Sequence, residues 1–314
     1  MEQTHESVLL NECLETLDIQ PGDVVVDGTI GGAGHFRALL EKLDASGTLI
    51  GIDADEDAIE RAAKVERTSG ATVHLAHDNF RNLGAILEHE GIESIDKALF
   101  DLGWSSFHLT SGRGFSFRAD EPLYMTYGSP EEGKTAADLI NSATEEELAD
   151  IIFTYGEERF ARGIAKSIVN ARRVSPILTT TELAEAVTAG VPGWYQHRRL
   201  HPATKTFQAL RIAVNDELGA LRAGLSEALT RLSPGGRIAV ITFHSIEDRI
   251  VKGMFRDAVY QGSGRLLSKK PLVPSDAETM RNPRARSAKL RVFERCTNLE
   301  SCAPVFDHAE LSLA

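Results

Sequence analysis

The chain of 314 residues is 42% hydrophobic and 25% charged, proportions that are ordinary for a globular protein with a substantial buried core. No apolar run approaches membrane-spanning length, and residues 1–6 have neither the basic flank nor the apolar block of a signal peptide. The three cysteines Cys13, Cys296 and Cys302 form no close pair, which argues against a disulfide framework or a zinc site. We therefore expect a cytoplasmic protein without a membrane partner.

The net charge of −12 is unevenly distributed along the chain. Between Trp194 and Arg295 there are 19 Lys and Arg against 9 Asp and Glu, and the remainder is strongly acidic. A basic segment inside an acidic chain is a candidate surface for phosphate groups. The alternative is scattered, solvated charge.

The first elements centre on a glycine-rich stretch, residues 27–35. Residues 5–17 have the apolar spacing of an amphipathic helix, residues 24–26 form a buried strand, and residues 36–43 resemble a helix. Glycines between strand and helix let a ligand approach main-chain N–H groups, and the helix N-terminus adds unpaired donors. The turn is therefore expected to hold the polar part of a nucleotide-like cofactor.

Two acids indicate which cofactor this is. Asp53 ends the second strand, residues 48–53, where an acid accepts hydrogen bonds from ribose hydroxyls. Asp27 ends the first strand and would repel a pyrophosphate, and the glycine spacing is not the G-x-G-x-x-G of nicotinamide enzymes. S-adenosylmethionine (SAM) carries an ammonium, a sulfonium and a ribose, so it fits better than a dinucleotide. The alternative is a glycine turn without a specific cofactor, which any doubly wound protein can carry.

Helix and strand signals then continue to alternate. Residues 55–63 read as a helix with acids in its first turn, and residues 72–76 read as a third strand. Asp78, Asn79 and Phe80 follow this strand, where a polar side chain and a ring are well placed to meet an adenine. Core packing is the alternative for Phe80.

The fourth strand, residues 91–101, ends in Asp101. Alternating strands and helices predict a parallel sheet with right-handed crossovers, whose chemistry lies at the carboxyl ends of the strands. Asp101 is therefore in position to act.

Residues 105–203 show little strand signal. Helices are expected at residues 136–141, 145–153, 158–171 and 181–187. Thr144 and Glu147 form the capping signature of the second of them. This stretch is expected to be a helical insertion that covers the cofactor and binds the substrate, with a rigid structural lid as the alternative.

The last third returns to the parent fold. We expect a long helix at residues 207–232, a tight turn at 233–236, a strand at 237–243 ending in His244, and a helix over residues 246–255. Residues 261–287 read as a mobile loop, residues 289–295 as a half-exposed strand, and the tail after Cys296 has no clear element. The expected fold is an α/β doubly wound, mostly parallel sheet. Its methyltransferase-type core comprises residues 1–104 and 207–314, and the helical insertion comprises residues 105–206.

The order of these motifs resembles the bacterial MraW (RsmH) family, which methylates small-subunit ribosomal RNA with SAM. The matching stretches are residues 5–10, 27–35, 52–53, 101–106, 113–117, 155–160, 201–215, 243–252 and 282–287. They span nearly the whole chain.

The resemblance implies methylation of the exocyclic N4 of a cytidine in 16S rRNA, at the decoding centre. The expected cofactor-binding residues are Asp27, Gly32, Ala33, Gly34, His35, Asp53, Phe80, Asp101 and His108. Ala33 stands where glycine is usual, and His108 where Gln is usual, so the contact of His108 can differ in geometry or depend on pH. The loop at 261–281 also departs from the family pattern.

The reaction needs an acceptor for an N–H of the cytosine amine. Asp101 is the first candidate, with Ser105 or Ser106 assisting, although Asp101 can instead bind only the cofactor. His244 is a further candidate for base contact or proton acceptance, against the alternative of a structural histidine. Trp104 and Phe115 are candidates for stacking on a flipped base, with core packing as the equal alternative. Candidates for phosphate contacts are Arg198, Arg199, Lys205, Arg284 and Arg286.

Three other functions remain open at this stage. A small-molecule methyltransferase would not need the basic segment or the large insertion. A non-catalytic, SAM-binding ribosome assembly factor would not need all of Asp27, Asp53 and Asp101. A nicotinamide dehydrogenase is disfavoured by the glycine spacing. The sequence leaves open whether naked RNA or an assembled subunit is the substrate, and whether the protein is a monomer or a dimer.

Overall fold

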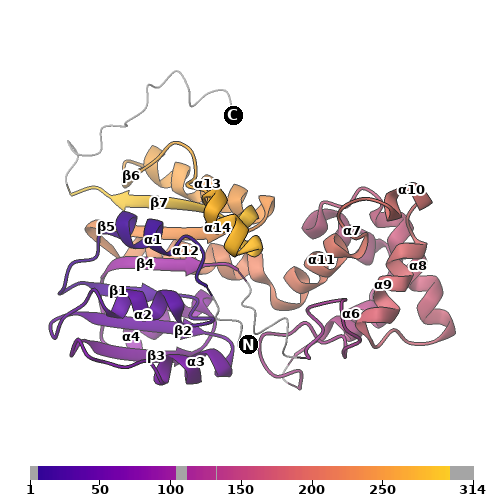
Figure 1. Ribbon diagram of the computed structural model, residues 1–314, viewed down its shortest axis with the longest axis horizontal. Coiled ribbons are helices and arrows are strands. Elements are labelled where there is room, and N and C mark those ends of the chain that lie inside the picture. The colour runs from indigo at the N-terminus through magenta and orange to yellow at the C-terminus, as the bar shows by residue number, and fades with distance from the viewer. Residues whose placement is uncertain (1–5, 104–111, 132, 298–314) are drawn as a thin grey trace. The chain divides into compact units, whose positions relative to one another are not determined.

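The chain divides into two compact units (Figure 1). The computed structural model describes residues 6–103, 112–131 and 133–297. Unit 1 comprises Met1–Trp104 and Gly219–Ala314, and unit 2 comprises Ser105–Leu218. Unit 2 extends beyond the boundary expected at residue 206, because the helix that spans this boundary packs within unit 2.

Unit 1 is built on a seven-stranded sheet with the strand order β3-β2-β1-β4-β5-β7-β6. The strands are β1 (Val24–Asp27), β2 (Thr48–Asp53), β3 (Thr72–His77), β4 (Ile95–Asp101), β5 (Leu232–Thr242), β6 (Gly264–Leu266) and β7 (Lys289–Arg295). Strands β1 to β5 pair in parallel, and β7 is antiparallel to both β5 and β6. The expected doubly wound, mostly parallel sheet is confirmed.

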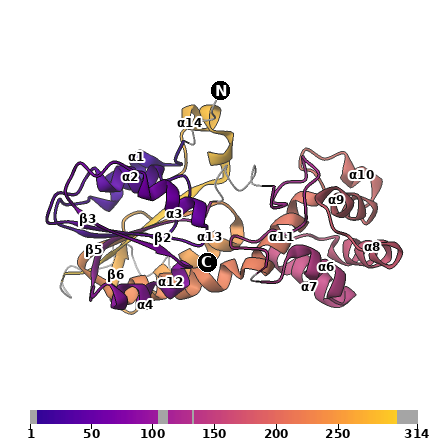
Figure 2. The ribbon, with the colours of Figure 1, turned by 90° about the horizontal axis from the view of Figure 1, so that it is seen from below.

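Helices cover both faces of this sheet. The helices that flank or follow its strands are α1 (Leu10–Leu17), α2 (Gly34–Leu40), α3 (Glu56–Ala63), η1 (Phe80–Asn82), α4 (Leu83–His89), α12 (Glu217–Arg231), α13 (Ser245–Tyr260), α14 (Asp276–Arg281) and η2 (Pro283–Ser287). Helices α1, α2 and α3 lie on one face, and α4 and α12 lie on the other (Figure 2). Residues such as Val25, Leu49 and Ile50 are therefore fully buried, which explains why these strands read as continuous apolar runs.

The sheet has one topological switch point that bears on function. Strand order runs from β1 outward to β3 on one side and from β4 outward on the other, so the order reverses between β1 and β4. In such sheets a crevice forms beyond the carboxyl ends of the two strands at the switch, and ligands bind there.

Unit 2 is helical. Its described helices are α6 (Ala136–Ser142), α7 (Glu145–Gly156), α8 (Ala161–Val174), α9 (Thr180–Ala189), α10 (Gly193–Gln196) and α11 (Ala203–Asn215). Their apolar faces form a separate core around residues such as Ile152, Ile164 and Leu210. The cap expected at Thr144 is confirmed, since its side chain accepts from the Glu147 N–H and Glu147 returns the bond.

Helix 207–232 was expected to be continuous, and this expectation is wrong. The structure has two helices, α11 and α12, separated at Asp216, whose φ of 45° ends the first helix in the left-handed region. Glu217 then begins α12 and pairs with Arg211, the Nε–Oε1 distance being 2.7 Å. Both helices are amphipathic, so the apolar periodicity carried no sign of the break.

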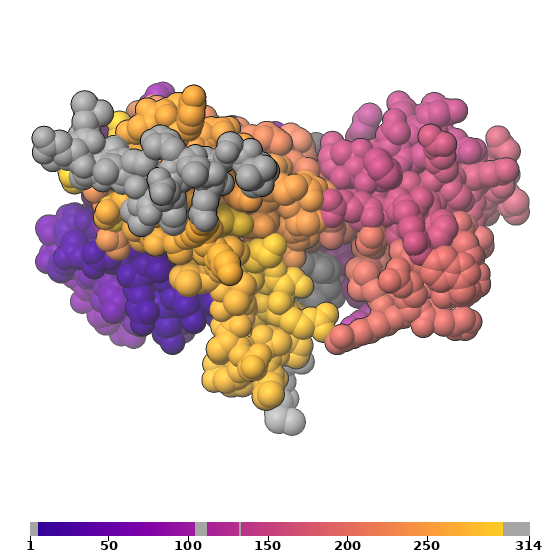
Figure 3. Space-filling model, turned by 90° about the horizontal axis from the view of Figure 1, so that it is seen from above, coloured from indigo at the N-terminus to yellow at the C-terminus, as the bar shows by residue number. Residues whose placement is uncertain are grey.

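Three expectations for the last third are also corrected. Residues 233–236 lie within β5, as an irregularity between the pairs Ile95↔Leu232 and Lys97↔Arg237, and not as a separate turn. Residues 261–287 contain β6, α14 and η2, and the last two project from unit 1 as the yellow segment in Figure 3. Strand β7 is mostly buried, because it lies between β5 and β6 and both α1 and α13 pack against it.

Two further expectations concern the cysteines and membrane-spanning segments. Cys13 is a buried free thiol, but Cys296 is disulfide-bonded, contrary to the expectation of reduced cysteines. No helix in the described part of the chain has the length and apolar character needed to cross a bilayer. The tail after residue 297 lies outside the described residues.

Candidate active site at the carboxyl ends of β1 and β4

Three acids end three adjacent strands of unit 1. Asp53 ends β2, Asp27 ends β1 and Asp101 ends β4, and these strands are neighbours in the order β2-β1-β4. The site therefore lies at the switch point, as expected from the sequence. Its character is strongly acidic, which is unusual beside a glycine-rich turn that offers backbone N–H groups.

Asp27 is fully buried and only half satisfied by hydrogen bonds. Its Oδ1 accepts from the Thr29 N–H at 3.1 Å, whereas its Oδ2 has no hydrogen-bond partner in the described part of the chain. Burial and the nearby charges of Asp101 and Asp53 together raise the pKa of Asp27 to about 7, although the hydrogen bond from the Thr29 N–H lowers it. A buried, unsatisfied carboxylate oxygen marks a place where a cationic or hydrogen-bonding ligand fits.

The glycine turn is held from both sides. Gly31 has a φ of 51°, and its N–H donates to Asp53 Oδ2 at 2.8 Å, while Arg61 Nε donates to the Gly31 carbonyl at 3.0 Å. The other oxygen of Asp53 accepts from the Asp55 N–H at 2.9 Å. Burial raises the pKa of Asp53. Each carboxylate oxygen retains a free lone pair, so Asp53 still has acceptor capacity for a ribose hydroxyl.

The turn leads into α2 through Ala33 and Gly34. Ala33 adopts a φ of 60°, a left-handed conformation that favours glycine. A Cβ on Gly34 would lie 2.0 Å from Ser7 Oγ, so the N-terminal segment packs directly on the turn and a side chain at position 34 would displace the Ser7 hydroxyl. Gly32 lies in the same turn between these residues and Gly31.

Asp101 is the most connected of the three acids. Its backbone N–H donates to Thr29 Oγ1 at 2.7 Å, and its Oδ1 accepts from the Gly103 N–H at 3.1 Å. His35, buried in the first turn of α2, places Nε2 3.6 Å from Asp101 Oδ2. Burial and, to a smaller extent, the negative charge of Glu247 raise the pKa of Asp101 to about 7, although the hydrogen bond from the Gly103 N–H lowers it. A carboxyl with such a pKa can exchange a proton near neutral pH.

Phe80 packs like a core residue, although it stays partly exposed. Its ring lies 5.5 Å from that of Phe100, and a Cβ on Gly224 would lie 2.5 Å from the Phe80 ring. Nearby, Asp78 Oδ1 accepts from the Asn79 N–H and from Asn82. The packing alternative for Phe80 therefore has direct contacts in its favour, and an adenine contact remains a prediction.

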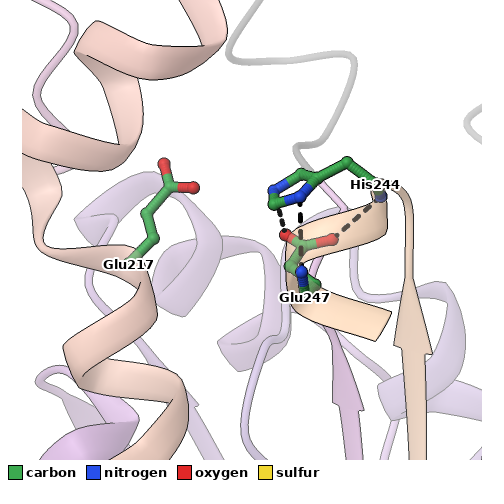
Figure 4. Close-up of side chains that lie close together, drawn as sticks. All are labelled: Glu217, His244 and Glu247. Atoms are coloured by element: carbon green, nitrogen blue, oxygen red, sulfur yellow. Dashed lines mark hydrogen bonds and ion pairs between the residues drawn. The ribbon is translucent and has the colours of Figure 1, made fainter. Parts of the chain in front are cut away.

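His244 caps helix α13 together with Glu247 (Figure 4). The Glu247 N–H donates to His244 Nδ1 at 3.4 Å, and Glu247 Oε2 accepts from the backbone N–H groups of Phe243 and His244. His244 Nε2 lies 3.0 Å from Glu247 Oε1 without a hydrogen bond in the described part of the chain. His244 therefore has structural contacts in the cap, and its role in base contact or proton acceptance stays a prediction.

Glu217, which Figure 4 also draws, belongs to unit 2. There it accepts from Arg211 Nε at 2.7 Å and from the Tyr127 hydroxyl at 2.9 Å.

The sequence analysis missed a contact that fixes the N-terminal segment. The Leu9 N–H donates to the buried Glu278 of α14 at 2.8 Å, and Asn282 Nδ2 donates to the Glu6 carbonyl at 3.2 Å. Arg281 also pairs with Glu6 at 3.2 Å. These bonds hold the segment that carries Ser7 against the cofactor turn. They also fix α14, which lies in the stretch expected to be a mobile loop. Since the partners are almost the whole chain apart, no local signal announces them.

The remaining candidates fall into three groups. Trp104, Ser105, Ser106 and His108 lie outside the described residues. Phe115 is buried in unit 2 and stacks on Tyr127 at 5.6 Å, so core packing describes its contacts. The candidates for phosphate contacts are exposed on unit 2, at Arg198 and Arg199, and on η2, at Arg284 and Arg286, whereas Lys205 is half-buried and donates to the Glu157 carbonyl.

The residues present fit SAM as a ligand. Asp27, Asp53 and Asp101 all have raised pKa values, so their negative charges are costly without a cation. SAM carries two positive charges and a ribose, whereas a dinucleotide would add a pyrophosphate to these acids. The orphaned Oδ2 of Asp27 and the open backbone of the turn offer it acceptors and donors.

Comparison with known proteins points in the same direction. Residues 2–296 match the model of the MraW methylase family. The chain is 48% identical over 307 residues to ribosomal RNA small subunit methyltransferase H of Syntrophotalea carbinolica, covering 93% of this chain and 98% of that protein. It is 49% identical over 294 residues to the protein of the same name from Deinococcus deserti, covering 93% of each chain.

Proposed function

This chain belongs to the MraW methylase family, and we propose that it transfers a methyl group from SAM to the exocyclic N4 of a cytidine in 16S rRNA, at the decoding centre of the small subunit. The name shared by its relatives supports ribosomal RNA as the substrate. The atom and its location are implied by the resemblance in sequence. A cytoplasmic location is part of this proposal, because the proposed substrate is ribosomal RNA.

A single observation carries the proposal, namely three carboxylates with raised pKa values around one glycine turn at the switch point. In this proposal Asp53 binds the ribose hydroxyls, and Asp27 with the turn residues Gly32, Ala33, Gly34 and His35 binds the amino-acid end of SAM. Phe80 contacts the adenine edge. When bound, SAM supplies an electrophilic methyl group on a sulfonium.

Asp101 is proposed as the hydrogen-bond acceptor for the attacking amine. The cytosine amine is a weak nucleophile, because its lone pair is delocalised into the ring. A carboxylate that accepts one N–H helps the nitrogen become tetrahedral and takes the released proton. The pKa of about 7 suits this role, since such a group is substantially ionised near neutral pH and still accepts a proton readily.

His244 is proposed to contact the base or to accept its proton. Its side chain is held beside Glu247 at the start of α13, with Nε2 3.0 Å from Glu247 Oε1. Ser105 stays a predicted assistant to Asp101, and His108 a predicted cofactor contact.

The experiment compares wild type with Asp101→Asn in SAM binding and in single-turnover methyl transfer to small subunits from cells that lack this enzyme. We expect the transfer rate to fall about 100-fold or more, with SAM affinity changed much less. Near-normal transfer by the variant would remove Asp101 from the chemistry. A loss confined to SAM affinity would assign it to cofactor binding.

The same experiment addresses the assembly-factor alternative, which the names of the relatives do not favour. A protein that binds SAM but transfers no methyl group to subunits or to free 16S RNA would contradict the proposed enzyme activity.

A further inference from the structure

Unit 2 carries an exposed cluster of rings and guanidinium groups between the start of α8 and α10. The rings of Phe160, Trp194 and Tyr195 meet edge to face, with centroid distances of 4.9 to 5.9 Å. The Arg159 guanidinium lies over all three rings, 4.7 Å from Phe160, 4.9 Å from Trp194 and 5.5 Å from Tyr195. The Arg198 guanidinium lies 5.4 Å from the Tyr195 ring.

A buried acid holds this cluster in place. Glu158 is completely buried, and its Oε2 accepts from the Tyr195 hydroxyl at 2.6 Å. Its Oε1 accepts from the Phe160 N–H at 2.9 Å. The Tyr195 ring is therefore fixed at one end by a charge-assisted hydrogen bond and at its face by arginine. A surface fixed in this way loses little side-chain entropy when a ligand binds.

Exposure and charge indicate what the cluster would bind. Trp194 is 59% exposed, although a large aromatic ring is normally buried in a folded protein. The exposed residues His197, Arg198 and Arg199 follow it within five positions of the chain. An exposed ring combined with arginines suits a ligand that has both flat π-faces and negative charges.

We infer that Arg159, Trp194, Arg198 and Arg199, here called the arginine–tryptophan surface, bind a single-stranded segment of the RNA substrate. A base stacks on the Trp194 indole, and the flanking phosphates pair with Arg198 and Arg199. Unstacked bases in single strands are recognised by aromatic rings and guanidinium planes in this way, whereas bases in a duplex are already stacked. This inference rests on the proposed function and names the part of the chain that holds the substrate.

The test measures the affinity for a labelled single-stranded 16S rRNA fragment and the KM and kcat for methylation of small subunits. We expect Trp194→Ala to weaken RNA affinity and raise KM about 10-fold, with SAM affinity unchanged. Trp194→Phe retains a ring and should recover most of the loss. Phe153→Ala is the matched control, since Phe153 is an equally exposed ring (63%) on α7 of the same unit. It should leave RNA affinity unchanged.

The phosphate contacts have their own readout. Arg198→Ala with Arg199→Ala should weaken binding and reduce the slope of log affinity against log salt by about 1 to 1.5, because two phosphate contacts are lost. Trp194→Ala should leave that slope unchanged. If these residues had only a structural role, their variants would change the melting temperature. The salt slope would then not distinguish the arginine variants from Trp194→Ala.

The outcomes separate the two proposals. If wild type methylates subunits and Trp194→Ala binds RNA as wild type does, the inference is overturned while the proposed function stands. If Trp194→Ala impairs methylation of assembled subunits but not RNA binding, the surface contacts a ribosomal protein, which also overturns the inference. If wild type transfers no methyl group to RNA, the proposed function itself fails.

Discussion

At the scale of residues, the site is defined by carboxyls that hold protons to unusually high pH. Asp27 and Asp101 each have a pKa of about 7 against an ordinary value of 3.8, mainly because burial disfavours the charged form. Such groups destabilise the ligand-free protein at neutral pH and are relieved by a bound cation. The buried carboxyls therefore lower the stability of the ligand-free protein, and binding of the cationic SAM removes this destabilisation.

This cost predicts an unusual pH dependence of stability. Between about pH 4 and pH 7 the folded protein holds more protons on these carboxyls than the unfolded chain does, so the free energy of unfolding falls as pH rises through this range. Asp27→Asn removes one of the titrations. It should flatten the profile and, at pH 8, stabilise the ligand-free protein by roughly 4 kcal/mol, the equivalent of about three pKa units. Urea unfolding at several pH values measures this.

Asp44→Asn serves as the control, because hydrogen bonds to Ser46 lower the pKa of Asp44. Its removal should instead reduce stability at neutral pH relative to acid pH. A profile for Asp27→Asn that matches wild type would show that Asp27 titrates normally.

Ala33 provides a second prediction at this scale. Its φ of 60° is unfavourable for a residue with a Cβ, so Ala33→Gly should raise the free energy of unfolding by about 1 kcal/mol. Ala228→Gly, in the interior of α12, should lower it by about 1 kcal/mol. Both are measured by urea unfolding without ligand. Equal losses for the two variants would contradict the strain assigned to Ala33.

The sequence predicted these acids but not their partners. The sequence places an acid at the end of three strands, because each apolar run ends at one of Asp27, Asp53 and Asp101. Thr29 and Glu247, which bond or influence Asp101, gave no comparable signal, because the sheet and α13 bring them together from distant parts of the chain. Their importance is visible only once the fold is formed.

At the scale of elements, helix α13 links the cap of a helix to the chemistry of the site. Glu247 both caps α13 and raises the pKa of Asp101. Glu247→Gln keeps one acceptor oxygen for the cap and removes the charge. The pKa of Asp101 should therefore fall, and the acid limb of the pH–rate profile should move to lower pH.

The pH dependence of single-turnover transfer measures this shift. Asp257→Asn, which removes an exposed charge from the last turns of the same helix, should leave the profile unchanged. An unchanged profile for Glu247→Gln would show that the acid limb does not report on Asp101.

Periodicity predicted the elements well where burial alone decides them. The parallel strands and the helices of unit 2 were anticipated because apolar residues repeat with the period of each structure. The break at Asp216 was missed because both flanking helices are amphipathic. Residues 261–287 were read as mobile from their Gly, Ser and Pro content, yet Glu278 and Asn282 bond to the N-terminal segment. Local composition carries no record of such a distant contact.

At the scale of the whole molecule, the described candidates for binding SAM all belong to unit 1, and the arginine–tryptophan surface belongs to unit 2. The proposed cofactor-binding residues and the arginine–tryptophan surface thus lie in separate compact bodies. This division agrees with the charge pattern, since the acidic N-terminal part of the chain carries the cofactor site and the basic segment begins in unit 2.

Ligand binding should therefore stabilise the protein by mass action. SAM at 100 times its Kd should raise the free energy of unfolding by about 2.7 kcal/mol, and Asp53→Ala should lose most of this gain. Glu56→Gln, an exposed acid three residues away on α3, should keep it. Thermal unfolding with and without SAM measures both. Full stabilisation of Asp53→Ala would contradict the assignment of Asp53 to the cofactor.

The most direct test of the account is to identify the methylated atom. Small subunits from cells lacking this enzyme are incubated with labelled SAM and the wild-type protein, and the rRNA is digested to nucleosides for mass spectrometry. The account predicts label in N4-methylcytidine, lost with Asp101→Asn. Label in any other nucleoside, or N4-methylcytidine formed equally well by the variant, would contradict it.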